Sequence, residues 1–340
     1  MIQIDLRSDT VTRPTPAMKE AMMNAPLGDD VFSEDPTINE LQRYAAELFG
    51  MEDALYCSSG TQTNQIAINV HTTPGDEVIC SNMAHVSVYE GGGIALNSGC
   101  SVALLEGDRG RITADQVKNH INPDDIHRPI TRLVCVEDTM NKGGGAIYAF
   151  DEIKKIAKVC KENNLAFHCD GARLFNALVA TGISPKEYGA QFDSISICLS
   201  KGLGAPVGSL LLGTKSFIQK ARRRRKSMGG GMRQAGIIAA AGLYALKHHV
   251  DRLKIDHDYA AQLGGVLEKC ASVESVLPVE TNIVIFQLKA GLTSESVVAK
   301  LAENGILCFP FGPDKIRMVT HLDLTSDHYK ILFEKLPSVL

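Results

Sequence analysis

The sequence predicts an α/β protein built around a mostly parallel β-sheet. Short apolar runs alternate with longer segments that carry apolar residues at helical spacing, which is typical of a parallel sheet flanked by helices. The apolar runs are continuous rather than alternating, as expected for strands buried on both faces. The chain has 340 residues, 44% of them hydrophobic and 22% charged, so it can bury a large core.

Seven of the apolar runs are predicted strands, and helical segments separate several of them. The clearest helical segments are Thr61–Val70 and Asp151–Asn163, and in the second Ile153, Ile156 and Cys160 recur at helical spacing. The predicted strands cover residues 54–58, 77–81, 101–106, 132–137, 165–169, 194–199 and 208–213.

The pattern changes beyond Gly213 and predicts a second, smaller α/β domain. A basic run and a glycine hinge at Gly229–Gly231 lead into a helix-rich stretch that continues to about Cys270. We predict a large domain over 1–248, including the N-terminal arm, and a small domain over 249–340. The small domain is expected to contain strands at 282–288, 306–309 and 316–320, a helix at 294–303 and a closing helix from 327.

Composition excludes several classes of protein. The net charge of −4 and the absence of tryptophan argue against nucleic-acid binding, although Arg222–Lys226 form a basic run. The longest apolar stretch, Ala235–Leu246, is too short to cross a bilayer, and Asp5 and Arg7 interrupt the region where a signal peptide is apolar. The nine cysteines form no CxxC pair and no HExxH occurs, so we expect a reduced cytoplasmic protein without a metal site.

Three unusual sequences follow predicted strands, where ligands of parallel α/β sheets bind. They are CSSGTQTN (57–64), HCDGAR (168–173) and CLSKGLGAP (198–206). Gly60 and Thr61 stand where a strand turns into a helix, which makes either an anion site or an ordinary capped turn. The dipeptide Gly-Lys is absent and no GxGxxG follows a strand, so the sequence gives no support for a nucleotide site.

Asp170 and Lys201 are the two candidate chemical groups. Asp170 at a strand end needs a cationic or N–H partner, and Arg173 could be that partner in a purely structural pair. Lys201 leaves an apolar strand for a glycine-rich turn, where it is either solvated or desolvated into a nucleophile. A Schiff-base lysine, a carboxylate for a pyridinium nitrogen and an anion cradle together are the parts that hold pyridoxal phosphate (PLP).

Longer motifs closely resemble the L-threonine aldolases, which are fold-type I PLP lyases, and most closely their low-specificity branch. The resemblance covers essentially the whole chain. It implies cleavage of L-threonine or L-allo-threonine to glycine and acetaldehyde, by a homotetramer with active sites shared between subunits. The motifs are DLRSDTVTRPTPAM (5–18), GDDVF (28–32), SSGTQTN (58–64), HCDGARLFNA (168–177), ICLSKGLGAPVGSLL (197–211), GGGMRQAG (229–236) and RMVTHLD (317–323).

The resemblance also implies a role for each matching residue. Lys201 matches the Schiff-base lysine, Asp170 the pyridine-nitrogen partner and His85 the histidine stacked on the cofactor ring. The remaining matches are Gly60 and Thr61 at the phosphate, Arg173 near the ring hydroxyl and substrate carboxylate, Ser8 and Arg317 at the carboxylate, His127 as a second active-site histidine, and Lys226 and Arg233 as residues that reach a neighbouring subunit's phosphate. Tyr89 and Glu90, which follow His85, are expected near the substrate hydroxyl, where His85 or His127 would act as the base.

One loop departs from the family pattern. Many relatives read Glu-Asn-Thr-His-Asn where this chain has Glu137-Asp138-Thr139-Met140-Asn141, and we expect this loop to border the site and alter its polarity. The alternative function is a PLP-dependent β-eliminating lyase on the same scaffold. It would use the same lysine and aspartate and would yield a keto acid and ammonia rather than glycine and an aldehyde.

Overall fold

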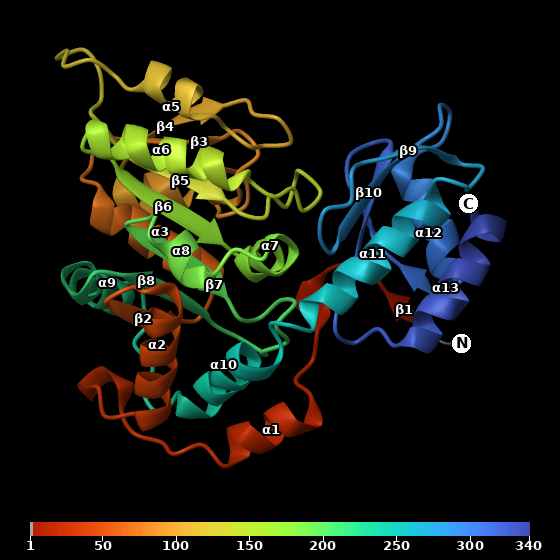
Figure 1. Cartoon of the computed structure of the whole chain (residues 1–340), viewed down its shortest axis with the longest axis horizontal. Coiled ribbons are helices and arrows are strands. Elements are labelled where there is room, and N and C mark those ends of the chain that lie inside the picture. The colour runs from red at the N-terminus through yellow and green to blue at the C-terminus, as the bar shows by residue number, and fades with distance from the viewer. Residues whose placement is uncertain (1–2) are drawn as a thin grey trace.

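A computed structural model describes residues 3–340 of the chain. Figure 1 shows two units side by side, a larger one built on a central sheet and a smaller one formed mainly by the C-terminal third. The large unit contains most of the candidate site, so its sheet is described first.

The central sheet confirms the predicted fold class. Within the described residues it has seven strands in the order β2-β8-β7-β6-β5-β3-β4. All neighbouring pairs are parallel except those of β8, which runs antiparallel to β2 and β7. The carboxyl ends of β2, β6 and β7 therefore share one edge. The strands are β2 (Asp53–Cys57), β3 (Glu77–Ser81), β4 (Ser101–Leu105), β5 (Thr131–Glu137), β6 (Ala166–Gly171), β7 (Ser194–Cys198) and β8 (Ser209–Gly213).

Helices cover both faces of this sheet. Successive strand side chains point to opposite faces, so Leu55 and Cys57 pack with α3 and α9 while Ala54 and Tyr56 pack with the helices of the other face. Side-chain caps mark several of the helix starts; at α3, for example, Ser59 Oγ accepts a hydrogen bond from Gln62 N. The helices are α1 (Pro16–Met23), α2 (Pro36–Phe49), α3 (Gly60–His71), α4 (His85–Val88), α5 (Ala114–His120), α6 (Phe150–Glu162), α7 (Leu174–Thr181), α8 (Pro185–Gly189), α9 (Lys215–Ser227) and α10 (Gly236–His248).

The C-terminal unit is an antiparallel sheet covered by helices, in the order β12-β13-β10-β9. The strand predicted at 306–309 is two short strands, β11 and β12, and β9 was not predicted. The elements are α11 (Leu253–Leu267), β9 (Val273–Val276), β10 (Ile283–Leu288), α12 (Ser294–Glu303), β11 (Ile306–Leu307), β12 (Phe309–Pro310), β13 (Lys315–Val319) and α13 (Ser326–Val339).

The N-terminal arm links the two units. Its strand β1 (Ile4–Asp5) pairs in parallel with β11, and Ile4 and Leu6 are buried in the hydrophobic core of the C-terminal unit. The arm then crosses to the central sheet through a 3-10 turn at Asp9–Val11. The division into 1–248 and 249–340 stays a prediction. The N-terminal arm, which the prediction counts in the large domain, packs with the C-terminal unit at one end and with the large sheet at the other.

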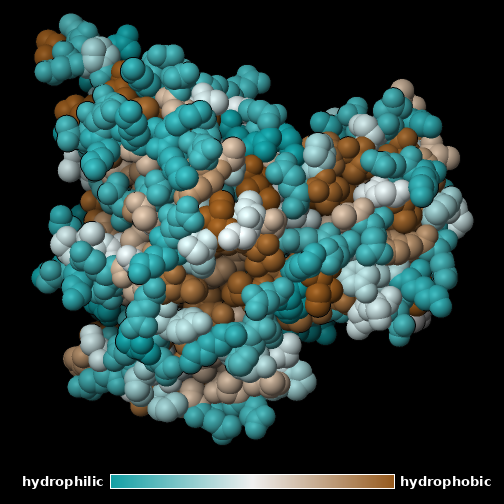
Figure 2. Space-filling model, viewed as in Figure 1, coloured by the Kyte–Doolittle hydropathy of each residue, from teal (hydrophilic) through white to brown (hydrophobic). Residues whose placement is uncertain are grey.

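The face shown in Figure 2 is largely hydrophilic. Figure 2 shows apolar side chains gathered in the middle of one face, over α7 and the region where α10 meets α11. A cavity of about 460 Å³ lies there, and Phe175, Leu178 and Val250 are among the residues that line it. All nine cysteines are buried and unpaired. In residues 3–340, no helix is both long and apolar enough to span a bilayer.

Candidate active site

The structure brings Gly60, Asp170 and Lys201 to the same edge of the central sheet. Gly60 begins α3 directly after β2, Asp170 lies near the end of β6, and Lys201 follows β7. Helix α3 is tied to both neighbouring strands, because its Thr63 Oγ1 lies 2.6 Å from Ser196 Oγ and its Asn64 reaches Asp170. The predicted convergence of the three motifs is therefore found in the fold.

The start of α3 is built to receive an anion. The Ser59 side chain caps Gln62 N, and the backbone N–H groups of Gly60 and Thr61 have no partner within the first helical turn. A Cβ at Gly60 would lie 3.7 Å from Ser209 Oγ, which is buried and has no hydrogen-bond partner in the described residues. Backbone N–H groups, a helix dipole and a free hydroxyl together suit a phosphate group.

Asp170 is a buried acceptor, only 2% exposed. Its Oδ2 accepts a hydrogen bond from Asn64 Nδ2 at 2.9 Å, and its Oδ1 accepts one from Ala172 N at 3.1 Å. An ionised carboxylate has about four lone-pair positions. Asp170 can therefore accept a further hydrogen bond from the protonated nitrogen of a ligand ring.

Lys201 lies in the glycine turn after β7, with its backbone held in place. Its carbonyl oxygen accepts hydrogen bonds from Thr12 Oγ1 at 3.0 Å and from Gly204 N at 2.8 Å. Lys201 and Arg173 line the same small space of about 10 Å³ beside the end of β6. The positive charge of the Lys201 amine also acts on Asp9, the partner of Arg173.

Arg173 is bound by Asp9, a residue that the sequence analysis did not single out. Arg173 Nε and Nη2 donate to the two carboxylate oxygens of Asp9 at 2.8 and 2.6 Å, and both side chains are buried. Burial opposes ionisation of Asp9, but the charge and hydrogen bonds of Arg173 outweigh it and hold the Asp9 pKa well below its ordinary value. A bidentate pair of this kind fixes the guanidinium plane.

A second arginine, Arg317 of β13, lies beside Arg173. Arg317 Nη1 donates to Asn141 Oδ1 at 2.8 Å, and Arg173 Nη1 lies 3.5 Å from the same oxygen. Burial, followed by the charge of Arg173, lowers the pKa of Arg317 to about 10. Arg317 Nε is buried without a partner among residues 3–340. A small carboxylate ligand would meet an unpartnered donor and excess positive charge here.

His85 stands at the start of α4 above two buried carboxylates. Its Nδ1–H donates to Glu90 Oε1 at 2.9 Å, and its backbone N–H donates to Glu137 Oε2 at 2.7 Å. A ring nitrogen of His85 and a carboxylate oxygen of each of Glu90 and Asp170 lie within 4.8 Å of one another. Burial opposes a charge on His85, but the bond to Glu90 and the negative charge of Asp170 raise its pKa.

Tyr89 and Glu90 differ in position. The Glu90 side chain is fully buried behind His85, and its Oε2 accepts from Gln65 Nε2 at 2.6 Å. Tyr89 is half exposed, with its ring 5.6 Å from the His85 ring. Glu90 therefore orients His85 in this structure, whereas Tyr89 can face a ligand. Ser8 is buried and caps the 3-10 turn, where its Oγ accepts from Thr10 N at 3.2 Å.

One expected site residue, His127, is not at this edge within one chain, whereas Lys226 and Arg233 lie on the surface beside the end of β2. His127 lies in the loop before β5, at the opposite end of that strand from Glu137, and its side chain is 83% exposed. Lys226 is exposed at the end of α9. Arg233 is also exposed, and its Nη1 donates to Asp29 Oδ2 at 2.9 Å. The active-site role of His127 therefore depends on a contact that one chain does not make, and the reach of Lys226 and Arg233 to a neighbouring subunit's phosphate stays a prediction.

The basic run Arg222–Lys226 contains a buried arginine that the sequence analysis missed. Arg225 is 2% exposed, donates to the carbonyl of Tyr56 at 2.6 Å and pairs with Asp30 at 2.5 Å. Gly230 packs against both Arg225 and Gln62 of α3. Arg225 thus joins α9 to the end of β2, and the run is not a uniform solvated face.

The loop at 137–141 borders the site, as expected, but its two departures from the family pattern, Asp138 and Met140, do not face it. Met140 is fully buried in the main core, in contact with Gly110, and does not face the site. Asp138 is also fully buried, and its Oδ2 accepts from the Tyr188 hydroxyl at 2.7 Å. Of the loop, Glu137 and Asn141 contact the site, through the His85 N–H and the two arginines. The side chains of Asp138 and Met140 therefore lie in the core beneath the site rather than in its lining.

Asp138 should make stability depend on pH. Burial raises its pKa from 3.8 to about 7, so the folded protein retains a proton that the unfolded chain releases. The contribution of Asp138 to stability is therefore largest below pH 4 and is lost as the pH rises towards 7. We expect Asp138→Asn to raise the free energy of unfolding by about 1–3 kcal/mol at pH 8.5 and by less than ~0.5 kcal/mol at pH 4.

Urea unfolding at the two pH values checks this expectation. Asp151→Asn is the matched control, because its side chain is 88% exposed and should alter neither value. Part of the pH dependence should survive in Asp138→Asn, since burial and the charge of Asp170 also raise the pKa of Glu137 to about 7. A variant as pH-dependent as the unaltered protein would contradict the assignment.

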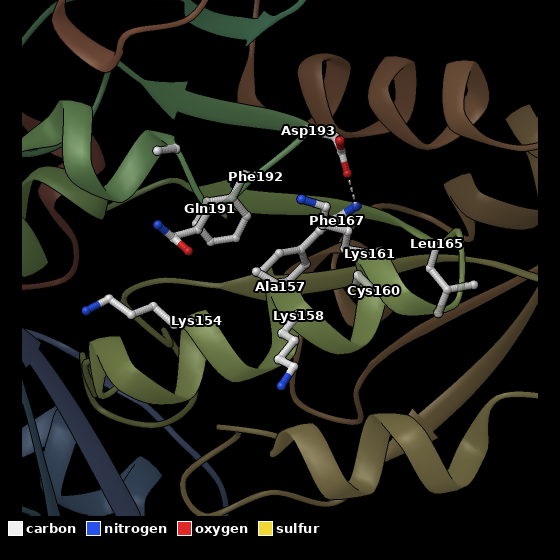
Figure 3. Close-up of a pocket in the computed structure, with 11 residues that line it drawn as sticks. Lys154, Ala157, Lys158, Cys160, Lys161, Leu165, Phe167, Gln191, Phe192 and Asp193 are labelled. Atoms are coloured by element: carbon white, nitrogen blue, oxygen red, sulfur yellow. Dashed lines mark hydrogen bonds between the residues drawn. The ribbon is translucent and has the colours of Figure 1, made fainter.

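A larger cavity lies away from these groups. Figure 3 shows it between α6 and the segment before β7, with Lys154 and Lys158 on its rim and the stacked rings of Phe167 and Phe192 inside it. Its volume is about 520 Å³, and it opens near the amino ends of β6 and β7. It contains none of the predicted site residues, so size alone does not locate the site.

Comparisons with known proteins find relatives that span most of the chain. The model of the beta-eliminating lyase family matches residues 5–290. A low specificity L-threonine aldolase of Escherichia coli K12 is 44% identical over 325 residues, which are 95% of each chain. Low-specificity L-threonine aldolase 1 of Arabidopsis thaliana is 40% identical over 340 residues, 97% of this chain and 95% of that one. The structure of a Leishmania major threonine aldolase is 22% identical with a TM-score of 0.86, covers 99% of this chain and 100% of its own, and shares the fold.

Proposed function

Because this chain belongs to the low-specificity L-threonine aldolases of the beta-eliminating lyase family, we propose that it cleaves L-threonine and L-allo-threonine to glycine and acetaldehyde with PLP as cofactor. The observation that carries the proposal is one edge of the sheet that holds a lysine, a buried aspartate, an anion-binding helix start and two arginines. That set accounts for the cofactor and for the substrate carboxylate.

The residues present fit PLP. Gly60, Thr61 and Ser209 would bind its phosphate, Asp170 would hold a proton on its pyridine nitrogen, and Lys201 would bind its aldehyde carbon. His85 would lie against the ring. When bound, PLP supplies an electron sink for the pair released when the Cα–Cβ bond of the substrate breaks.

Arg317 and Arg173 would bind the substrate carboxylate. Asp9 already occupies two donors of Arg173, so its main effect is to present Nη1 beside Arg317. Arg317 Nε is the buried donor that still needs an acceptor. Fixing the carboxylate at this point orients the bonds at Cα and selects the L configuration.

His85 is the group in this chain that can remove the β-hydroxyl proton. Glu90 accepts from Nδ1–H, so Nε2 is the ring nitrogen left to exchange a proton with a substrate. General-base catalysis by a positioned histidine is worth ~10²–10⁴-fold. Protonated His85 cannot act as a base. Because its pKa is raised, His85 becomes protonated, and activity is lost, at a higher pH than for an ordinary histidine.

The test is to incubate the PLP-loaded protein with L-threonine and identify the products. Glycine and acetaldehyde in equal amounts support the proposal. A keto acid and ammonia would instead support the β-eliminating alternative, which the name of the matching family model keeps open. Protein freed of PLP is the control, and it should regain activity when PLP is restored.

We expect both L-threonine and L-allo-threonine to be cleaved and neither D-isomer. The carboxylate site fixes Cα, whereas His85, and His127 if a neighbour supplies it, would approach the hydroxyl from different directions. Measuring kcat/KM for the four stereoisomers tests this. Discrimination above about a thousandfold between the two L-isomers, which is ~4 kcal/mol, would show that a single acceptor selects one hydroxyl configuration.

The proposal includes a homotetramer with shared active sites, in the cytoplasm. Supporting observations are the exposed His127 next to Ile126, which is 98% exposed, and Arg233 beside Phe32, which is 67% exposed. Exposed apolar groups beside polar ones are typical of subunit contacts. The buried, unpaired cysteines are consistent with a reducing compartment.

Mixing two inactive variants tests the sharing of sites. Lys201→Ala and Arg233→Ala would each inactivate a site, and hybrids would contain one site with neither defect. Equal mixing should recover about a quarter of the original activity for a twofold pair. Lys201→Ala mixed with Asp170→Asn is the control, because both residues come from one chain and no site would be intact. Equal recovery in both mixtures would contradict shared sites.

A further inference from the structure

A chain of hydrogen bonds leads from Asp170 into the sheet, and the donor and acceptor of each bond can be assigned. Asn64, 1% exposed on α3, donates one amide hydrogen to Asp170 Oδ2 and the other to Glu90 Oε1, both at 2.9 Å. An amide nitrogen carries two hydrogens, so both are used. The reverse amide orientation would place Oδ1 against two acidic oxygens. Asn64 Oδ1 must therefore point away from the site, as an acceptor.

His168 supplies the donor that this oxygen needs. It lies two residues before Asp170 on β6, on the same face of the strand, and is fully buried. His168 Nε2 is 3.1 Å from Asn64 Oδ1, so Nε2 carries the hydrogen. Burial lowers the pKa of His168 to about 3, so the ring is neutral and Nδ1 is an acceptor.

Two further groups fix this tautomer. Ser194 Oγ is 2.8 Å from His168 Nδ1 and donates its hydrogen there. The same oxygen then accepts from His71 Nε2–H, also at 2.8 Å. His71 lines a cavity of about 430 Å³ that shares Leu165 and Asp193 with the cavity in Figure 3. Every hydrogen along the chain thus points towards the acidic groups of the site.

We propose that His168 is a positioning residue. Its Nε2–H holds the Asn64 amide in the one orientation that restrains both Asp170 and Glu90, and Glu90 in turn orients the His85 ring. One donor that touches neither cofactor nor substrate thereby fixes the two groups that face the cofactor ring. The inference rests on the proposed function, because that function gives Asp170 and His85 their roles.

Two substitutions separate this role from general packing. The amide nitrogen of glutamine reaches the position of Nε2 and can donate to Asn64, whereas asparagine is shorter and can replace only Nδ1. In the PLP-loaded enzyme we expect His168→Asn to lower kcat for L-threonine roughly ten- to hundredfold, which is the effect of losing a hydrogen bond that supports a charged group. KM should change less than about threefold. His168→Gln should regain most of the lost kcat. His120→Asn, on the exposed face of α5, should leave kcat unchanged.

A readout without turnover completes the test. In ¹⁵N-histidine-labelled protein without PLP, His168 should show a protonated Nε2 and an unprotonated Nδ1 from pH 5 to 9. A protonated Nδ1, or equal losses of kcat in His168→Gln and His168→Asn, would overturn the proposal. Failure of the unaltered enzyme to cleave L-threonine would overturn the proposed function instead, since the tautomer measurement needs no substrate.

Discussion

Lys201→Ala is expected to abolish cleavage of L-threonine, with a loss of more than about a thousandfold, while the protein stays folded. Covalent attachment of the cofactor requires an amine at this position, and alanine has none. The fold should survive, because the turn is held through the backbone carbonyl of Lys201 by Thr12 and Gly204. Asp9 keeps its bidentate bond to Arg173 when the nearby lysine charge is removed.

Absorbance and turnover measured together test this expectation. The unaltered protein with PLP should show the visible band of a lysine-bound cofactor, and Lys201→Ala should not. Lys215→Ala is the matched control, since this lysine is exposed at the start of α9 and remote from the site. If Lys201→Ala kept both the band and turnover, another lysine would carry the cofactor.

Local sequence was sufficient to predict the central sheet and the convergence of its three motifs. Each of the seven strands is a continuous apolar run, and the carboxyl ends of β2, β6 and β7 must meet because those strands share a direction. Strand β1 could not be found in this way. It has two residues and pairs with β11, some three hundred residues later, so no local pattern marks it.

The residues missed at the site are those whose role depends on long-range contacts. Asp9 is far from Arg173 in sequence, and only the fold shows that this buried pair joins the N-terminal arm to the start of α7. Asn64 belongs to a recognised motif. Its two acceptors, Glu90 and Asp170, lie in other segments of the chain, and only the fold brings the three side chains together.

Helical phase explains a second kind of miss. Arg225 and Lys226 are adjacent in a run of five basic residues, and only their angle about the axis of α9 makes one buried and the other exposed. His127 illustrates the remaining gap. The resemblance assigns it to an active site, but within one chain it lies at the opposite end of β5, and a sequence does not say which subunit completes a site.

Asp170→Asn is expected to retain PLP but to lower kcat by roughly 10²–10³-fold. An amide cannot hold the pyridine nitrogen protonated, and preorganised charge of this kind is worth ~3–4 kcal/mol in the transition state. The substitution also disturbs the surrounding bonds. Both Asp170 oxygens accept, from Asn64 and from Ala172, so one of these donors would face the new NH₂ group.

The pH profile distinguishes this electrostatic role from a structural one. The charge of Asp170 raises the pKa of both His85 and Glu137, so in Asp170→Asn both pKa values should fall. The acid limb of the kcat profile should therefore move to lower pH, because His85 would lose its proton earlier. Asp193→Asn is the control, since this carboxylate accepts from Phe167 N at 2.8 Å at the other end of β6. Turnover close to that of the unaltered enzyme, with an unmoved acid limb, would show that Asp170 serves only the fold.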